Sequence, residues 1–311
     1  MSGRRFTFIG VTTGSSSIMR IFPRWREVLE LGADLELVGR DIPVGAPPSD
    51  YRKAVQELID EPGAVGALIT THKIGIYQEG RDLFAGVDDL GELCGEVSCL
   101  AKRDGRLYGW AKDPVAAGRT LERLLSPSHF RDGGGHVLCM GAGGSGTAIA
   151  LYLLARRPDG DHPARVVVTD RSPERLDRVR ETLARVSHSS SVELESADRH
   201  EQLLDSLPPR SLVVNATGMG KDLEGSPLPP GASFPHEAVV WELNYRGELD
   251  FLEQARVQAD ARGLTVEDGW IYFINGWSSV MEEVFLRPIS EADLAVLAAE
   301  AEFARPERGE P

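Results

Sequence analysis

Apolar runs of strand length alternate with stretches of helical periodicity along the first third of the chain. The apolar runs cover residues 6–11, 35–38 and 66–69, and the helical stretches cover residues 18–31 and 50–59. Two further runs, 96–101 and 106–110, flank Asp104-Gly105 and predict a hairpin with a tight turn. Strands that alternate with helices favour a mainly parallel sheet with helices on its faces.

The same alternation begins again after a polar, Gly-rich stretch at residues 126–135, which we expect to link two domains. An amphipathic helix is expected before it, over residues 113–125. Beyond it, strands are expected at residues 136–140, 165–169, 192–195, 212–215 and 239–242, and helices at residues 147–157, 173–186, 249–262 and 276–286. We therefore predict an N-terminal α/β domain over residues 1–125 and a second α/β domain over residues 126–269. A helix at about 270–290 is expected to pack back on the first domain, and residues 301–311 to form a frayed tail.

Composition and charge exclude several classes of function. The 311 residues are 41% hydrophobic and 26% charged, as in ordinary globular proteins of two domains. The net charge of −14 argues against a nucleic-acid partner, and no apolar run reaches the roughly 18 residues that span a bilayer. Cys94, Cys99 and Cys139 show neither metal-binding nor disulfide spacing. We expect a cytoplasmic protein without a metal, present as a monomer or a homodimer.

A glycine-rich turn opens the second domain. Residues 137–146 read Val-Leu-Cys-Met-Gly-Ala-Gly-Gly-Ser-Gly, so a strand runs directly into a turn that contains Gly141, Gly143, Gly144, Ser145 and Gly146. In a dinucleotide-binding turn, Gly141 permits the tight bend, Gly143 lets the backbone approach a pyrophosphate, and Gly146 lets the following helix pack on the strand. The free N–H groups of that helix hold the diphosphate. The motif therefore predicts a C-terminal Rossmann domain that binds NAD or NADP.

A carboxylate follows at the end of the next strand of this domain. Asp170 ends that strand, slightly later than the usual spacing of about 20 residues after the glycine motif. A carboxylate at this place accepts hydrogen bonds from the ribose hydroxyls and repels a 2′-phosphate, which favours NAD over NADP. A helix cap before Pro173 is the alternative role for Asp170. Arg171 is a candidate for stacking on the adenine or for pairing with a phosphate.

A nicotinamide enzyme also needs a group that exchanges the hydroxyl proton of its substrate. Residues 66–73 (Gly-Ala-Leu-Ile-Thr-Thr-His-Lys) end a strand with Thr70, an imidazole and Lys73. Residues 109–113 (Gly-Trp-Ala-Lys-Asp) put Asp113 at the start of the helix after the hairpin. Taken alone, Lys73 is typical of a solvated loop charge and Asp113 of a helix cap. Their order around the glycine turn favours the catalytic role for both.

In this order the two segments resemble the shikimate/quinate dehydrogenase family. That family carries Asn-Val-Thr-x-Pro-x-Lys at the end of a strand and Gly-x-Asn-Thr-Asp after a hairpin, so the resemblance places Lys73 on its catalytic lysine and Asp113 on its catalytic aspartate. The resemblance covers roughly residues 6–287 and continues through the glycine turn to Asp268-Gly269. It implies cofactor binding by the residues of two further segments, Asn215, Thr217, Met219 and Asn244.

The resemblance also implies substrate-binding residues, several of which depart from the family. Ser15 and Ser17 match two serines spaced i, i+2, with an ordinary Ser-rich turn as the alternative. Thr70 belongs to the lysine segment. Four positions carry other residues than the family: Ile18 replaces a proline, Leu68 and Ser98 replace asparagines, and Asn275 replaces a glutamine. Ala111 and Lys112 likewise replace Asn-Thr before Asp113, which points to a changed substrate more than to a changed reaction.

Three functions follow from these observations. The first is oxidation or reduction of shikimate, quinate or a related hydroxylated ring acid, and the second is the same chemistry on another polyol or hydroxy acid. The third is a dinucleotide-binding regulatory module without turnover, against which the retention of Lys73 and Asp113 speaks. We expect desolvation to lower the pKa of Lys73 and the charge of Asp113 to counteract this. His72 and Tyr245 are expected to be packing residues.

Overall fold

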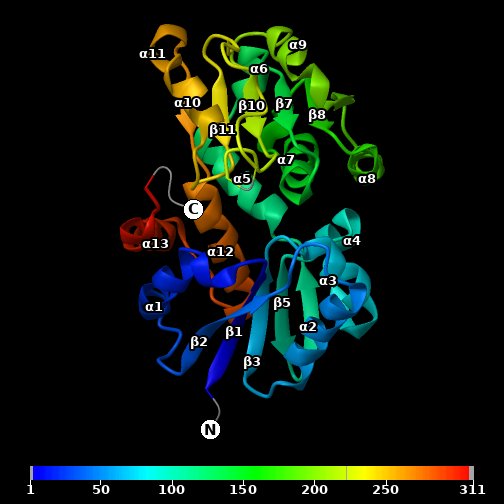
Figure 1. The fold of residues 1–311 in the computed structure, drawn as a ribbon, viewed down its shortest axis with the longest axis vertical. Helices are drawn as coiled ribbons and strands as arrows, with labels where there is room; N and C mark the ends of the chain where they lie inside the picture. Colours follow the sequence, from blue (N-terminus) through cyan, green and yellow to red (C-terminus); the bar gives the residue numbers. More distant parts are fainter. Residues whose placement is uncertain (1–2, 222, 308–311) are drawn as a thin grey trace. The chain divides into compact units, whose positions relative to one another are not determined.

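Each half of the chain forms its own six-stranded sheet within the described residues (Figure 1). The computed structural model describes residues 3–221 and 223–307. One compact unit comprises the residues up to Asp113 together with Ile274–Arg305, and a second comprises Pro114–Phe273; we call them unit 1 and unit 2. The chain passes from one unit to the other within α5 (Asp113–Leu124) and again within α12 (Trp270–Phe285).

The sheet of unit 1 mixes parallel and antiparallel pairs in the order β2-β1-β3-β5-β6-β4. Its strands are β1 (Arg4–Gly10), β2 (Leu35–Asp41), β3 (Ala64–Ile69), β4 (Phe84–Val87), β5 (Cys99–Arg103) and β6 (Arg106–Trp110). β1 is parallel to β2 and β3, β5 is antiparallel to both its neighbours, and β4 is parallel to β6. Asp104 and Gly105 have φ values of 50° and 76°, as the predicted tight hairpin turn requires.

Helices cover both faces of this sheet. They are α1 (Ile18–Val28), α2 (Pro48–Asp60), α3 (Lys73–Gly80), α4 (Asp89–Cys94), α13 (Glu291–Ala301) and the greater part of α12. Ile9 of β1 packs with Val55 of α2 on one face. On the other face, Phe6 lies 6.0 Å from the ring of Phe22 in α1 and 6.1 Å from the ring of Trp277 in α12. β1 is apolar along most of its length because both of its faces are covered.

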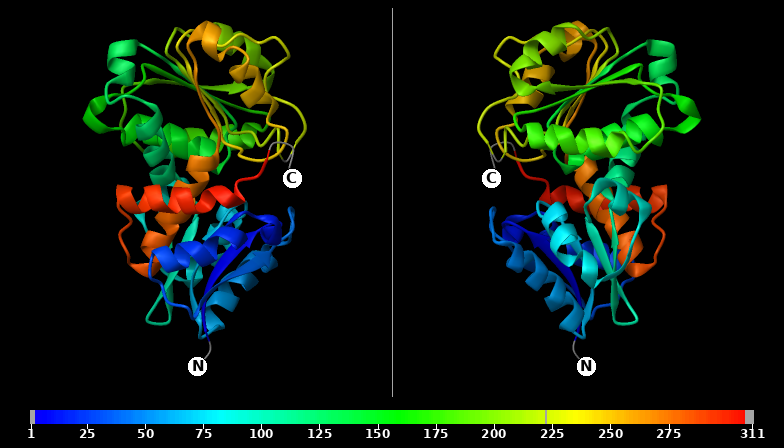
Figure 2. Two further views of the ribbon diagram at one scale, coloured as in Figure 1. Left: turned by 90° about the vertical axis from the view of Figure 1, so that its left-hand side faces the viewer. Right: turned by 90° about the vertical axis from the view of Figure 1, so that its right-hand side faces the viewer.

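The sheet of unit 2 is parallel throughout, in the order β12-β11-β10-β7-β8-β9. Its strands are β7 (Val137–Met140), β8 (Arg165–Asp170), β9 (Ser191–Ser196), β10 (Leu212–Asn215), β11 (Val239–Glu242) and β12 (Thr265–Glu267). Its helices are α6 (His129–Gly133), α7 (Gly144–Ala155), α8 (Pro173–Leu183), α9 (His200–Asp205), α10 (Asp250–Arg256) and α11 (Ala259–Arg262), which with α5 form layers on both faces of the sheet (Figure 2). The strand order reverses between β7 and β10, as in a Rossmann fold.

The core of unit 2 explains why its strands read as short, unbroken apolar runs. Leu138, Val213 and Val240 lie on three adjacent strands and pack with Leu204 of α9 and Phe251 of α10. All five side chains are almost fully buried. A strand buried on both faces has no polar alternation, so apolar runs of only three or four residues mark β7, β10 and β11.

Several short elements were not expected from the sequence. They are α3, β4, α4, α6, α9, β12 and α13. The single helix expected over residues 249–262 is divided into α10 and α11. Ala301 ends α13 and Ala304 is buried, so the expected frayed tail begins later than residue 301; residues 308–311 of that tail lie outside the described residues.

The polar stretch at residues 126–135, expected to link two domains, is an integral part of unit 2. The amide of Phe130 donates to the buried carboxylate of Asp161 at 3.0 Å, and Nε2 of His129 lies 2.9 Å from the carbonyl oxygen of Arg210. The compact units divide instead at Asp113/Pro114 and at Phe273/Ile274. The polar composition of this segment therefore does not indicate a linker. Its polar groups form hydrogen bonds within the unit to which the segment belongs.

Candidate active site

Strand directions bring four segments of unit 1 to one edge of its sheet. β1, β3 and β6 run in the same direction, so their carboxyl ends lie at one edge, and the antiparallel β5 begins there. The segments are residues 11–17 after β1, 70–73 after β3, 95–98 before β5 and 111–113 after β6. The amide of Ile69 donates to the carbonyl oxygen of Ser98 at 2.9 Å. The amide of Ser98 donates to the carbonyl oxygen of Trp110 at 3.0 Å. Most of the substrate and catalytic residues expected from the sequence therefore lie along this edge.

The loop after β1, which carries Ser15 and Ser17, is fastened to the end of β2. The carboxylate of Asp41 accepts from the amide of Thr13 at 2.8 Å and from its hydroxyl at 2.6 Å. These hydrogen bonds hold the pKa of Asp41 below its usual value. Ser15 is exposed and donates to the carbonyl of Thr12 at 3.1 Å, whereas Ser17 is buried at the start of α1.

The loop after β3 presents Lys73 while its other polar groups bond to the backbone. The hydroxyl of Thr70 lies 3.3 Å from the carbonyl oxygen of Ile9, to which the Thr70 amide also donates. Nε2 of His72 lies 2.8 Å from the carbonyl oxygen of Ile42, and its ring packs 5.4 Å from that of Tyr51. Thr70 and His72 therefore order the loop, and Lys73 begins α3.

Asp113 is positioned by bonds to the two residues before it. The carboxylate of Asp88 accepts from the amide of Ala111 at 3.1 Å, and the hydroxyl of Ser98 accepts from the amide of Lys112 at 2.8 Å. Nζ of Lys112 donates to Glu283 at 2.7 Å. The hydroxyl oxygen of Ser98 thus accepts a hydrogen bond from the loop before α5, which leaves it less acceptor capacity for a substrate.

Lys73 and Asp113 form an ion pair in which the ammonium of Lys73 donates to Oδ2 of Asp113. Their side chains are only 17% and 11% exposed. Burial acts to lower the pKa of Lys73, but the negative charges of Asp113 and Glu96, with the hydrogen bond to Asp113, outweigh it and raise this pKa above its usual value. The lowering of this pKa expected from desolvation is therefore outweighed, first by Asp113 and then by Glu96, which the sequence did not reveal.

Asn275, the remaining candidate for substrate binding, is a buried residue of α12. It belongs to unit 1. Its carbonyl oxygen lies 3.2 Å from the hydroxyl of Ser278 one turn later.

In unit 2, the glycine turn after β7 has the backbone that its sequence predicted. Gly141 has φ of 114°, and a Cβ at this position would lie 2.4 Å from the carbonyl oxygen of Ala216. A Cβ on Gly146 would lie 1.9 Å from the carbonyl oxygen of Gly141, so only glycine lets α7 begin this close to the strand. A Cβ on Gly143 would meet no protein atom within 4 Å. The amino end of α7, which begins at Gly144 and includes Ser145, thus has an open approach that fits a diphosphate.

Asp170 lies beside this turn at the end of β8. Its Oδ2 accepts from the amide of Ala142 at 2.8 Å, and its Oδ1 accepts from that of Ser172 at 2.9 Å. Ser172, not Asp170, caps α8. Arg171 is exposed, and Arg175 lies 3.7 Å from the carboxylate. The carboxylate is therefore fixed next to the glycine turn, with two arginines near it in the sequence.

The loop after β10 is organised around the buried carboxylate of Glu242. Glu242 accepts from Nδ2 of Asn215 at 2.5 Å and from Nδ2 of Asn244 at 2.7 Å. Oδ1 of Asn215 accepts from the amide and the hydroxyl of Thr217, and the carbonyl of Met219 accepts from Asn244. Burial raises the pKa of Glu242 to about 8 despite these hydrogen bonds. The side chains of Asn215 and Asn244 thus shape the loop that the resemblance assigned to the cofactor.

Sequence reasoning missed two residues, Glu96 and Glu242. Both are carboxylates with at most 3% exposure. Each carboxylate stood at a place that indicated burial. Glu96 precedes β5, which pairs with the strand before Lys73, and Glu242 follows the apolar run Val-Val-Trp. Tyr245, in contrast, packs against Trp270 and Phe273 with ring distances of 5.3 and 4.8 Å.

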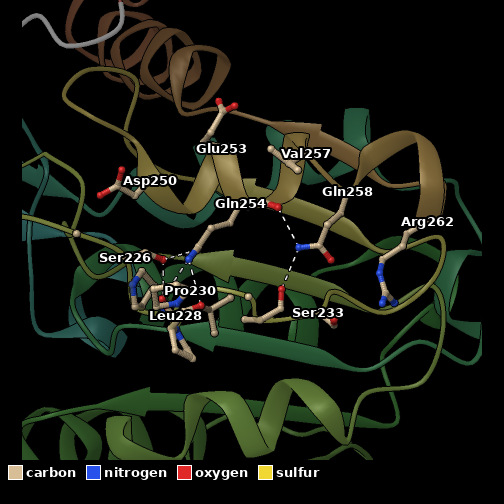
Figure 3. Close-up of a pocket in the computed structure, with 15 residues that line it drawn as sticks. Ser226, Leu228, Pro230, Ser233, Asp250, Glu253, Gln254, Val257, Gln258 and Arg262 are labelled. Atoms are coloured by element: carbon tan, nitrogen blue, oxygen red, sulfur yellow. Dashed lines mark hydrogen bonds between the residues drawn. The ribbon is translucent and has the colours of Figure 1, made fainter.

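A pocket of about 1020 Å³ in unit 2 lies between α10 and the loop at residues 225–233 (Figure 3). Gln254 donates to the carbonyls of Leu228 and Pro229, and Gln258 donates to that of Ala232. None of the residues expected to bind substrate or cofactor lines it. Its polar groups hold the loop to the helix, so we place the candidate site elsewhere.

Residues 3–221 and 223–307 offer neither a metal cluster nor a membrane-spanning helix. These residues contain no group of three or more His, Cys, Asp or Glu side chains that could hold a metal ion. No helix among them is long and apolar enough to cross a membrane.

Comparison with known proteins decides the family. No family model matches the chain. The shikimate dehydrogenase (NADP(+)) of Xanthomonas oryzae pv. oryzae (strain MAFF 311018) is 30% identical over 233 residues, which cover 72% of this chain and 75% of the relative. The enzyme of the same name from Symbiobacterium thermophilum (strain DSM 24528 / JCM 14929 / IAM 14863 / T) is 30% identical over 263 residues, covering 81% and 82%. The chain belongs to the shikimate dehydrogenase family.

Solved structures share the fold of this shikimate dehydrogenase family member. A shikimate dehydrogenase in complex with NADP+ matches it with a TM-score of 0.72 at 18% identity, over 98% of this chain and 96% of the other. The 5-ketofructose reductase of Gluconobacter sp. strain CHM43, in its ligand-free form, matches with a TM-score of 0.65 at 21% identity, over 97% and 99%.

Family membership confirms the predicted fold class and the predicted reaction class. The chain is a dinucleotide-dependent oxidoreductase of the type that acts on a CH–OH group. The relatives are named for NADP(+), so they support a dinucleotide but not the expected preference for NAD.

Proposed function

We propose that this enzyme interconverts a secondary alcohol and a ketone on a hydroxylated ring acid, with Lys73 and Asp113 as its catalytic residues. The observation that supports this most strongly is the ion pair at the edge of the unit 1 sheet between the buried Asp113 and the largely covered Lys73. An ammonium held by one carboxylate is suited to exchange a proton with a substrate hydroxyl. Asp113 orients that ammonium and is itself fixed through Ala111 and Lys112.

The roles of the chain's own groups follow from their protonation. A bound nicotinamide dinucleotide supplies the hydride acceptor or donor, and the open approach at Gly143 fits its diphosphate. In oxidation, the neutral amine of Lys73 takes the hydroxyl proton as the alcohol carbon loses hydride. In reduction, the ammonium of Lys73 gives its proton to the carbonyl oxygen as that carbon gains hydride.

A substrate other than shikimate is the second candidate. The hydroxyl of Ser98 accepts from the Lys112 amide, that of Thr70 lies against the carbonyl of Ile9, and Leu68 offers no polar group. Fewer hydroxyl and amide groups are therefore available to a ring acid than the resemblance implied. A 5-ketofructose reductase shares the fold, so the fold itself does not restrict the substrate to shikimate.

The test is a panel of substrates assayed for cofactor reduction. Shikimate and quinate represent ring acids, and open-chain polyols and 2-hydroxy acids represent the second candidate, each with NAD+ and with NADP+. Turnover of ring acids alone supports the first proposal, and turnover of polyols or hydroxy acids alone supports the second. No turnover of any compound, with dinucleotide binding intact by calorimetry, would contradict both and favour a regulatory module.

We further propose NAD as the preferred cofactor, against the names of the relatives. Asp170 is fixed beside the glycine turn by two backbone amides, where its charge would oppose a 2′-phosphate. Arg171 and Arg175 are the groups that could offset this charge. The ratio of kcat/KM for NAD+ and NADP+ in the unaltered enzyme tests the proposal.

The remaining proposals concern the state of the protein in the cell. Its cysteines are free in the structure, and Cys99 and Cys139 are buried, which suits the reducing cytoplasm. We propose a monomer or a homodimer with a small-molecule substrate as its ligand. Light scattering on the purified protein distinguishes the two assemblies.

A further inference from the structure

Glu96 is a buried carboxylate that the proposed proton exchange does not use. It is 3% exposed and follows Gly95, which ends α4 with a left-handed φ of 63°. The Glu96 amide donates to the carbonyl of Gly91 at 3.2 Å, and the next amide, of Val97, donates to the carbonyl of Lys73 at 3.3 Å. The backbone thus fixes Glu96 beside the first residue of α3.

Glu96 forms a closed group of three charges with the ion pair. The charges that act on Lys73 are those of Asp113 and Glu96, and the charges that act on Glu96 are those of Asp113 and Lys73. Burial and the charge of Asp113 together raise the pKa of Glu96 to about 7, although the charge of Lys73 acts to lower it. The ammonium of Lys73 is therefore paired with Asp113 and also lies under the charge of Glu96, which changes near neutral pH.

The other charged groups around this group of three have partners of their own. Asp88 accepts from the amides of Gly91 and Ala111. Glu92 bonds to Tyr77 and Arg81. Lys112 pairs with Glu283. None of these five charged side chains is among the groups that change the pKa of Glu96, which are Asp113 and Lys73.

Resting on the proposed function, we propose that Glu96 is a positioning residue whose negative charge keeps Lys73 protonated above neutral pH, so that the site is tuned to reduce a ketone. The ammonium of Lys73, which donates to Asp113, is ready to protonate a carbonyl oxygen. After the proton has gone to the product hydroxyl, the amine takes a proton from water. In the opposite direction, the alcohol can lose its proton only to the rare neutral amine, which both carboxylates disfavour.

The charge of Glu96 has a consequence that depends on pH. An opposite charge a few ångströms from an ionisable group moves its pKa by about one unit or more. Above pH 8 Glu96 is ionised, so Glu96→Gln should make Lys73 more acidic. Below pH 6 Glu96 is already protonated in the natural protein, so the same substitution should change little. The natural chain therefore contains its own control.

The first experiment measures alcohol oxidation from pH 6 to pH 10, with the best substrate of the panel. We expect kcat/KM for the Glu96→Gln enzyme to be about tenfold higher at pH 8–10 and to converge with the unaltered enzyme at pH 6. Glu92→Gln removes a carboxylate of α4 that is paired with Arg81 and should leave the profile unchanged. An equal change at all pH values, or no change, would overturn the proposal.

The second experiment does not depend on activity. Brief labelling with acetic anhydride at a series of pH values, read by peptide mass spectrometry, reports the neutral fraction of Lys73. We expect its titration to move to lower pH in Glu96→Gln, and in Glu96→Leu should the glutamine variant fail to fold. An unmoved titration in a folded variant refutes the role of Glu96. A moved titration in a protein that turns over no substrate leaves that role standing and refutes the proposed function.

Discussion

At the scale of single residues, the buried carboxylates decide how each unit responds to pH. Glu242 is fully buried, and it accepts hydrogen bonds from the side chains of Asn215 and Asn244 and from the Asn244 amide. Its pKa of about 8 in the folded protein lies far above the value of about 4.5 expected when unfolded. The folded state therefore favours the protonated acid, and folding is coupled to proton uptake.

This coupling predicts a pH-dependent loss of stability. The contribution of Glu242 is fully present below pH 4.5 and is lost as the pH rises to about 8, because the folded pKa is raised. We expect unfolding free energies measured in urea to fall between pH 5 and pH 8 by on the order of 2–4 kcal/mol more in the natural protein than in Glu242→Gln. Glu201→Gln, which changes an exposed carboxylate at the start of α9, should leave the slope unaltered. Parallel slopes for Glu242→Gln and the natural protein would contradict the assignment.

Asp170 provides a second prediction at this scale. If its charge favours NAD, Asp170→Asn should lower the NAD:NADP ratio of kcat/KM by about tenfold, roughly 1.4 kcal/mol. Asp177→Asn changes an exposed carboxylate of α8 that is paired with Arg180, and it should leave the ratio unchanged. A natural enzyme that strongly prefers NADP would show that Arg171 and Arg175 outweigh Asp170.

Residue identities could be read from the sequence, but their environments could not. Lys73 and Asp113 were proposed from their order in the chain, and the structure brings them into one ion pair. The pKa of Lys73 also depends on Glu96, whose approach requires the pairing of β3 with β5. A charge brought close by sheet pairing leaves no local mark in the sequence.

At the scale of elements, the turn between β7 and α7 shows how one glycine can serve binding and another folding. Gly143 has φ of −76° and open space where its Cβ would be, whereas a Cβ on Gly146 would overlap the Gly141 carbonyl. Gly143→Val should therefore fold with nearly normal stability and lose most of its dinucleotide affinity, as measured by calorimetry. Gly146→Val should fold poorly. Unchanged dinucleotide affinity in Gly143→Val would show that the diphosphate does not bind at this turn.

The elements that could be predicted are those whose burial requires a regular pattern of apolar residues in the sequence. β7, β10 and β11 are apolar because helices cover both faces, and α2 and α5 are amphipathic because one side faces a core. α3 escaped prediction because Lys-Ile-Gly-Ile-Tyr-Gln-Glu-Gly has no apolar stripe at helical spacing. α4 and β12 are only six and three residues long, too short for any periodicity to show.

At the scale of the whole molecule, catalytic and cofactor residues belong to separate units. Lys73, Asp113 and Glu96 lie in unit 1, and the glycine turn, Asp170 and Glu242 lie in unit 2. The sequence indicated two domains but not their limits, because the chain passes between the units inside α5 and α12, where helical periodicity continues without a break. Long-range contacts, rather than local composition, define the two units.

This division predicts which property each catalytic substitution changes. Lys73→Ala should lower kcat by roughly 10²–10⁴-fold on the best substrate, the usual contribution of a positioned acid–base group. Its dissociation constant for the dinucleotide should stay nearly constant, because the glycine turn lies in unit 2. Asp113→Asn should also slow turnover, and the double variant should be little slower than Lys73→Ala, because residues that act as one unit are not additive.

The control for this series is Lys53→Ala, which removes an exposed lysine of α2 paired only loosely with Glu57, at 3.9 Å. Its kcat should match that of the natural enzyme, which separates the loss of one positive charge from the loss of the ion pair. Stopped-flow measurement of a single turnover then tests whether the chemical step itself is slowed. If Lys73→Ala keeps a nearly normal kcat while the natural enzyme is active, the proton must be exchanged by another group. Strictly additive effects of the two substitutions would show that Lys73 and Asp113 act separately, although they share an ion pair in the folded chain.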